Sequence, residues 1–149
     1  MTHEWLTAGG NTVTTATFEE VLSDTSASIH VGSDSHYIGG EWIFATVVCA
    51  YREGKGGNFF YRRRRLPKSA FRNLYDRLMQ EVSFSIEAAE ELKASVKREP
   101  SIHLDVNWQT TATARLMPML TSYVKSMGYD TKVKPDAWAS SSIADKKAR

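Results

Sequence analysis

Two aspartates stand at the ends of apolar segments, in the stretches "SIHVGSD" and "SIHLDVN". Asp34 ends the first stretch, and Asp105 follows the apolar residues of the second. Both segments are typical of β-strands, and parallel neighbouring strands end at the same edge of a sheet, where α/β proteins bind ligands. If these two strands are parallel neighbours, Asp34 and Asp105 lie side by side at that edge. Two carboxylates at such a short distance repel each other unless a cation lies between them. Because hard oxygen ligands favour Mg²⁺ or Mn²⁺, the pair predicts a divalent metal site.

Two more aspartates lie near the end of the chain. Asp136 follows Pro135 in "KVKPDAWA", where a last helix is expected to begin. Alone, an aspartate there is typical of a helix cap, but convergence with Asp34 and Asp105 favours a metal ligand. Asp145 lies nine residues further on, roughly 13 Å along a helix. Unless that helix is bent, Asp136 and Asp145 cannot both contact one ion.

A long amphipathic helix is predicted from residue 69 to about 96, because apolar residues recur there at intervals of three and four. This helix starts at the acidic edge, so only the carboxylates of its early turns can reach the site. Glu81 borders the buried face beside Leu78 and Val82. We therefore favour Glu81 as the ligand from this helix, with Glu87 as the alternative.

Basic and aromatic residues near the acids are candidates for substrate binding. In "YRRRRLPK", Arg65 and Lys68 are expected to flank the cleft and contact phosphates. The alternative is a charged edge strand that avoids pairing with other chains, and the sequence does not decide between them. His36 either contacts a phosphate or belongs to a turn, and the turn is favoured. Trp108 follows Asp105 closely and is a candidate for stacking on a base.

Composition sets limits on the other classes of function. The chain has 149 residues, a net charge of +2 and 42% hydrophobic residues, as expected for one globular domain. A single cysteine, Cys49, excludes an internal disulfide and a Cys/His zinc site. No segment resembles a signal peptide or a membrane span. A cytoplasmic protein without membrane association is therefore expected, and its oligomeric state is open, a dimer included.

The elements that must position these residues form an α/β pattern. Residues 1–16 are expected to be an irregular N-terminal arm, and residues 17–149 a single domain. Five strands are predicted at residues 28–33, 41–53, 58–67, 101–107 and 129–135. Helices are predicted at 17–24, 69–96 and 111–128, and residues 136–149 are expected to form a short final helix with a basic tail. The first three strands should be antiparallel because tight turns connect them, and the last two parallel because they follow helices. The prediction is a mixed five-stranded sheet with helices on both faces.

Three motifs carry a resemblance to a known family: "VGSDS", "HLDVN" and "KPDAWASSSIADK". With the order of strands and helices, they resemble the ribonuclease-H-like superfamily, and most closely the YkuK family of predicted RNase-H-related nucleases from bacteria and phages. The resemblance covers residues 17–147 and implies an RNase-H-like fold.

The resemblance also implies a chemistry and a role for each acid. It implies a nuclease that hydrolyses phosphodiester bonds in RNA, RNA–DNA hybrid or structured DNA with two Mg²⁺ or Mn²⁺ ions. Asp34 would bridge the ions and Asp105 would be the second core ligand. Asp136 would match the final aspartate and Glu81 the helix glutamate. The alternative is a non-catalytic nucleic-acid-binding module on the same fold.

Overall fold

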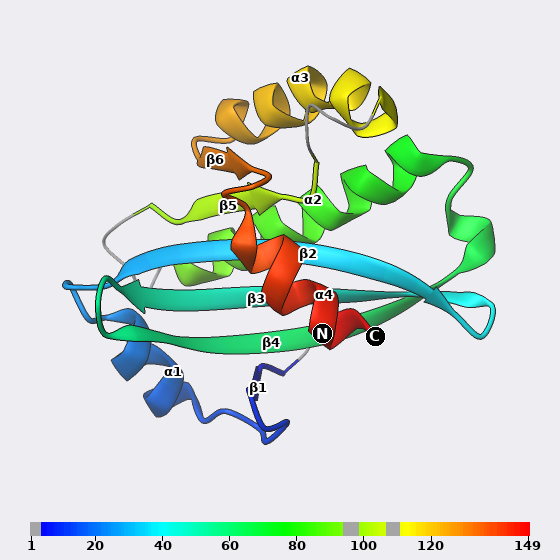
Figure 1. Ribbon diagram of the computed structural model, residues 1–149. Coiled ribbons are helices and arrows are strands. Elements are labelled where there is room, and N and C mark those ends of the chain that lie inside the picture. The colour runs from blue at the N-terminus through cyan, green and yellow to red at the C-terminus, as the bar shows by residue number, and fades with distance from the viewer. Residues whose placement is uncertain (1–3, 94–98, 107–110) are drawn as a thin grey trace.

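The computed structural model describes residues 4–93, 99–106 and 111–149, and Figure 1 shows the path of the chain. Its elements, in chain order, are β1 (Leu6–Thr7), α1 (Thr15–Leu22), β2 (Ser28–Ile38), β3 (Glu41–Arg52), β4 (Gly56–Pro67), the 3-10 helix η1 (Lys68–Ala70), α2 (Leu74–Leu92), β5 (Ser101–Leu104), α3 (Thr111–Ser126), β6 (Asp130–Val133), the π-helix η2 (Ala139–Ala144) and α4 (Asp145–Ala148). None of the described helices is both long enough and apolar enough to cross a membrane. Strands and helices alternate in the second half of the chain, which makes this a mixed α/β fold.

The strands form one mixed sheet in the order β1-β4-β3-β2-β5-β6. β2, β3 and β4 are antiparallel neighbours, whereas β5 runs parallel to β2 and β6 parallel to β5. These orientations confirm the prediction from tight turns and helical crossovers. The predicted number of five strands is wrong, because Leu6 and Thr7 of the N-terminal arm pair with Tyr61 and Phe60 of β4. The arm therefore supplies a sixth strand.

β2 is longer than the strand predicted at residues 28–33, because its pairing with β3 continues to Ile38. The hairpin closes at Gly39 and Gly40, whose φ angles of 61° and 86° favour glycine. Asp34 therefore lies inside β2 and not at its end. β5 pairs only with the β2 residues from His30 to Gly32. Beyond them, no strand of the described chain adjoins β2 on that side, and Asp34 stands at this open edge.

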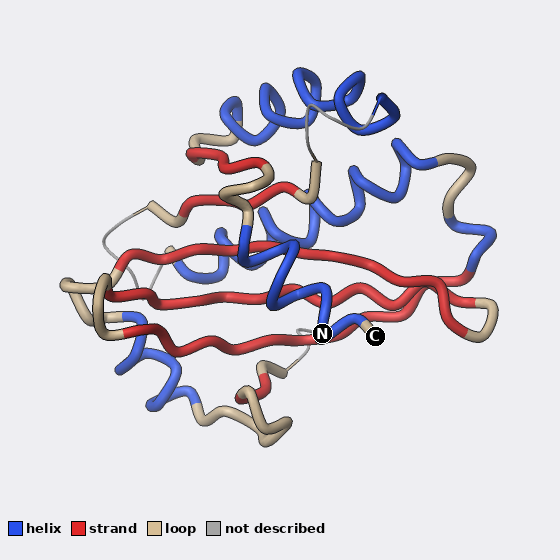
Figure 2. Tube along the Cα trace, viewed as in Figure 1, coloured by secondary structure: helices blue, strands red, loops and turns tan. Residues whose placement is uncertain are grey.

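Helices cover both faces of the sheet, as predicted. Successive residues of β2 point to opposite faces, and on one face Ile29 and Val31 pack in a cluster with residues of α1 and α2. A second cluster joins α2 to β5 and α3. On the other face, Ala45 and Val47 of β3 pack with residues of η2 and α4. Figure 1 shows η2 and α4 in red crossing the front of β2, β3 and β4, and Figure 2 shows the same layers by type of structure.

The first long helix starts later than predicted. After η1 the chain is extended at Phe71, and α2 begins behind the N-cap Asn73, whose side chain accepts a hydrogen bond from the Asp76 N–H. α2 ends at Leu92, and residues 94–98 lie outside the described chain. The later start leaves Glu81 only two turns into α2, near the open edge of β2.

The final segment is not the single short helix with a basic tail that is predicted within residues 136–149. Asp136 lies in a turn after β6, and η2 then precedes the short α4. The Ala139 N–H at the start of η2 donates to Nδ1 of His103 in β5, at 3.0 Å. This bond ties η2 to the sheet, and both η2 and α4 contact β2.

Candidate metal centre

Asp34 and Asp105 face each other at the open edge of β2. The pairing of β2 with β5 ends at Gly32 and His103, and each aspartate follows two residues further along its segment. Glu81 reaches the same place from α2. One carboxylate oxygen of each of these three acids lies within 4.8 Å of the other two. The structure thus brings together three of the four carboxylates that the sequence predicts for a metal site.

A second group contains Asp34, His36 and Asp145. Asp34 and His36 are two residues apart on β2, so they point to the same face, the one that η2 and α4 cover. His36 Nε2 lies 2.7 Å from Asp145 Oδ1 and 3.5 Å from Asp34 Oδ2. One possible ligand atom from each residue lies within 4.8 Å of the others. Asp34 therefore belongs to both groups.

Glu81 is held in place by two polar neighbours. The Ser35 hydroxyl donates to Glu81 Oε2 at 2.6 Å, and Arg77 Nη1 donates to Ser35 Oγ at 2.9 Å and to Glu81 Oε2 at 3.3 Å. Glu87, the alternative considered from the sequence, points elsewhere and accepts two hydrogen bonds from Arg64 at 2.7 and 3.0 Å. The carboxylate from α2 at the acidic cluster is therefore that of Glu81.

The buried acids raise one another's pKa values. Burial raises the pKa of Asp34 well above its ordinary value, and the charges of Glu81 and Asp105 raise it further. The pKa of Glu81 is also raised, mainly by burial; the hydrogen bond from Ser35 acts to lower it and the charge of Asp105 to raise it. Without a cation the cluster holds protons, because so many adjacent carboxylates cannot all ionise. A bound divalent cation would favour their ionised forms and release those protons.

The donor set fits a hard divalent cation. Carboxylate oxygens are the usual ligands of Mg²⁺ and Mn²⁺. Asp105 Oδ1 is buried and accepts no well-oriented hydrogen bond within the described residues, although Lys134 Nζ lies 2.6 Å away. Burial acts to lower the pKa of Lys134, but the close contact with the Asp105 carboxylate outweighs burial and raises it. A positive charge is thus stabilised where these oxygens converge.

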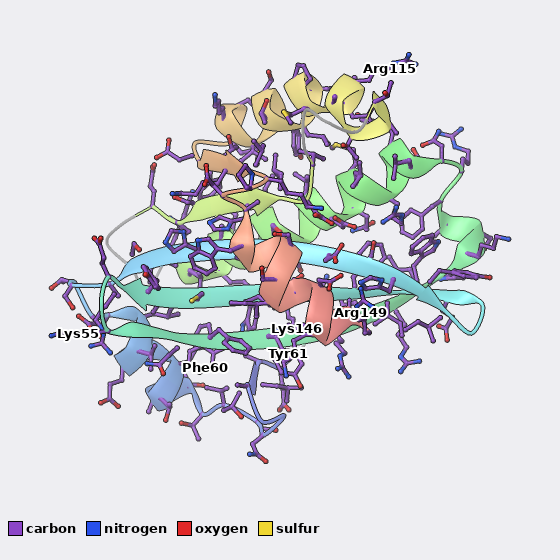
Figure 3. All side chains as sticks on the ribbon, viewed as in Figure 1. Lys55, Phe60, Tyr61, Arg115, Lys146 and Arg149 are labelled. Carbon is purple, nitrogen blue, oxygen red and sulfur yellow. The ribbon has the colours of Figure 1, made fainter. Side chains whose placement is uncertain are left out.

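Asp136, predicted as the final aspartate of the site, lies outside both groups. Its side chain is exposed, and its N–H donates to Val133 O at 2.8 Å in the turn after β6. Asp145 lies at the cluster instead, because η2 carries the chain back across β2. Burial acts to raise the pKa of Asp145, but hydrogen bonds with His36 and Asp34 outweigh it and lower the pKa. Arg149, labelled in Figure 3 beside α4, adds an ion pair to Asp145 at 3.4 Å.

The arginines of β4 have mainly structural partners. Arg62 is buried, with Nη1 2.7 Å from Glu91 Oε2 of α2. Arg64 pairs with Glu87 on the same helix. These two arginines therefore hold α2 against the sheet. Arg65 is exposed, at 64% of its side chain, and its predicted phosphate contact stays a prediction.

The other predicted substrate-binding residues have different surroundings. His36 lies within β2 and hydrogen-bonds Asp145, so the favoured placement in a turn is wrong. Lys68 is exposed in η1, and its Nζ lies 5.8 Å from the centre of the Tyr37 ring. Trp108 lies outside the described residues.

One known protein family matches almost all of this chain. The model of the family described as ribonuclease H-like matches residues 13–149. No curated protein matches the chain. The narrower assignment to the YkuK family stays a prediction. Because the match spans nearly the whole sequence, the chain belongs to the ribonuclease H-like family.

Proposed function

We propose that this protein is a divalent-metal-dependent nuclease that hydrolyses phosphodiester bonds in RNA, RNA–DNA hybrid or structured DNA. One observation carries the proposal: Asp34 belongs to two groups of possible ligand atoms, each within 4.8 Å, at an open edge of the sheet. Two-metal phosphodiesterases hold their ions about 3.5–4 Å apart, and a shared carboxylate suits that spacing. Membership of the ribonuclease H-like family supports a nucleic-acid substrate.

The two groups divide the ligands between two Mg²⁺ or Mn²⁺ ions. Asp34 would bridge them, Glu81 and Asp105 would complete the ligands of one, and His36 and Asp145 those of the other. When bound, the ions would activate the attacking water and stabilise the leaving oxygen. Asp145 takes the role that the sequence suggested for Asp136.

Two basic residues next to the acids have supporting roles in this proposal. Arg77 orients Glu81 through direct contact and through Ser35. Lys134 balances the charge of Asp105 before a cation binds. Since the Lys134 side chain is 37% exposed, its Nζ would be free to contact a substrate phosphate once a cation replaces it.

Calorimetric titration with Mn²⁺ tests the proposal, combined with cleavage of labelled single-stranded RNA, RNA–DNA hybrid and branched DNA. Asp34→Asn should lose Mn²⁺ binding and reduce cleavage at least about 100-fold, since it removes the shared ligand. Asp136→Asn is the matched control, because it removes an exposed carboxylate outside both groups, and it should behave as wild type. Undiminished Mn²⁺ binding and cleavage by Asp34→Asn would contradict the proposal.

A second candidate function is a non-catalytic nucleic-acid-binding module. The contact of Lys134 Nζ with Asp105 Oδ1 at 2.6 Å favours it, because this ion pair partly neutralises the acids without a metal. In that case Asp34→Asn would leave nucleic-acid binding unchanged or strengthen it by removing a negative charge. The wild type would also cleave none of the three substrates.

A further inference from the structure

A cavity of about 270 Å³ lies beside the metal centre, between the β2–β3 hairpin, η1 and the start of α2. Trp42, Phe71 and Leu74 form its apolar wall, and it is also lined by the cations Lys68, Arg72 and Arg77. We call it the aromatic cavity. Its volume is just below the range of about 300–1,000 Å³ typical of small-molecule sites. A cavity of this size fits a single planar ring that belongs to a longer polymer better than it fits a larger free ligand.

Arg77 connects the aromatic cavity to the metal centre. Its guanidinium carbon lies 4.3 Å from the centre of the Trp42 ring. The same guanidinium donates to Ser35, the neighbour of Asp34, and lies 3.3 Å from Glu81. A group bound in the aromatic cavity would therefore lie one side chain away from the metal centre, where a scissile phosphate would bind.

The cations at the rim are available for an anionic ligand. Lys68 is exposed. The Arg72 side chain is 88% exposed, and its contact with Asp76 at 3.4 Å is a surface ion pair of little strength. The aromatic surface extends past the cavity, because Tyr37 is 48% exposed and its ring centre lies 5.4 Å from that of Trp42.

We propose that the aromatic cavity binds one unpaired nucleotide of the substrate, next to the bond that is cleaved. The base would lie against Trp42 and Phe71, and Lys68 and Arg72 would contact the adjoining phosphates. Aromatic platforms beside cations are the usual binding surface for single strands. A base within a duplex is stacked on both sides and cannot enter. This inference rests on the proposed nuclease function and names its substrate class: a single strand, or a duplex with an unpaired flank.

Fluorescence anisotropy tests this inference in the Asp34→Asn background, in which cleavage should be at least about 100-fold slower. The probes are a labelled single-stranded RNA of about 12 nucleotides, a blunt RNA–DNA hybrid of the same sequence, and the hybrid with an unpaired flank. The single strand and the flanked hybrid should bind more tightly than the blunt hybrid. Phe71→Ala should weaken single-strand binding about 5- to 100-fold through lost stacking.

The double variant Lys68→Ala/Arg72→Ala tests the rim without risk to the fold, because both side chains are exposed. It should weaken binding of the single strand about 10-fold. The slope of the logarithm of the binding constant against the logarithm of the salt concentration should become shallower by about 0.7 per lost phosphate contact. The matched control is Lys55→Ala/Arg115→Ala, which removes two exposed cations. Figure 3 labels them at one end of the sheet and on α3. The control should bind as the parent protein does.

The outcomes separate this inference from the nuclease proposal. Equal affinities of the rim variant and the control for the single strand would overturn the aromatic cavity as a binding site, even if the wild type cleaves nucleic acid with Mn²⁺. Weaker binding by the rim variant alone would support the cavity, even if the wild type cleaves nothing. Equal binding of the blunt and flanked hybrids would overturn the preference for unpaired nucleotides.

Discussion

His36 and Asp145 are hydrogen-bonded, with Nε2 2.7 Å from Oδ1, although they lie 109 positions apart in the sequence. The contact fastens the start of α4 to the C-terminal part of β2. It also places the Asp145 carboxylate beside Asp34, where the sequence suggested Asp136. In the proposed metal site, Asp145 therefore takes the place of the final aspartate because of the path of η2.

Asp145→Asn should weaken binding of one Mn²⁺ ion about 10- to 100-fold and reduce cleavage with it. The reason is that Asp145 supplies an oxygen to only one of the two groups. Calorimetry of Asp145→Asn and Asp136→Asn side by side measures the difference. If Asp136→Asn were the variant that lost an ion, the assignment of ligands would be wrong.

The metal-free protein should become less stable between about pH 7 and pH 9, by on the order of 1–3 kcal/mol. Asp34 and Glu81 have pKa values raised above those of the unfolded chain, near 4. Their protonation stabilises the folded state fully below pH 4, and this stabilisation is lost as the pH rises through the raised values. Burial lowers the pKa values of His30 and His103 to about 4 and about 3. These two histidines therefore make the folded state more stable as the pH rises towards about 6.5. Their gain opposes the loss from the acids at lower pH, so the window begins at about pH 7.

Urea unfolding in EDTA at several pH values measures this loss of stability. Asp34→Asn should flatten the profile, because the amide does not titrate. Added Mg²⁺ should stabilise the wild type more at pH 9 than at pH 7, since fewer protons then compete with the ion. A wild-type profile that rises across this window, or that Asp34→Asn leaves unchanged, would contradict the account.

A chain of hydrogen bonds through two buried histidines should support the position of Asp145. The Ala139 N–H donates to His103 Nδ1, so His103 Nε2 carries the proton and donates to His30 Nδ1 at 2.9 Å. His30 Nε2 then donates to Ser28 Oγ at 2.8 Å. Because the first donor is a backbone N–H, the direction of every bond is fixed.

His103→Phe removes the acceptor for the Ala139 N–H and should cost about 1–3 kcal/mol of stability. It should also weaken Mn²⁺ binding, because η2 no longer holds Asp145 at the site. His103→Asn keeps an acceptor close to the position of Nδ1 and should restore part of the Mn²⁺ affinity. The supporting role would be disproved by Mn²⁺ affinities equal to that of the wild type in both variants at a temperature where both are folded.

Arg62→Ala should destabilise the protein by about 3–5 kcal/mol, because it leaves Glu91 without its buried partner. Arg65→Ala, in the same strand but exposed, should change stability by no more than about 0.5 kcal/mol. Urea unfolding of the two variants compares them directly. Similar stabilities would mean that the pairing of Arg62 with α2 has no structural role.

The sequence predicts the parts of this site that depend on local patterns. Alternating and continuous apolar residues identify the strands, and their connections fix which are parallel. Asp34 and Asp105 could therefore be placed beside each other without a structure. Glu81 could be chosen because it borders the apolar stripe of its helix and lies early enough to reach the edge.

What the sequence did not predict depends on contacts between distant segments. β1 has only two residues, which form a strand because β4 offers them a free edge. η2 is a π-helix that starts at Ala139, whose N–H donates to His103 Nδ1 in β5. The residues near Ala139 in the sequence do not indicate this contact with a distant strand. The run of serines at 140–142 was a weak signal, since Ser141 Oγ donates to Ala137 O at 2.7 Å and such bonds often bend helices.

The measurement that tests the central claim most directly is anomalous X-ray diffraction from crystals soaked in Mn²⁺. We predict two manganese peaks on either side of the Asp34 carboxylate, one beside Glu81 and Asp105 and the other beside His36 and Asp145. Crystals of Asp34→Asn grown in the same way should show neither peak. Manganese bound beside Asp136, or no manganese near Asp34 in the wild type, would contradict the account.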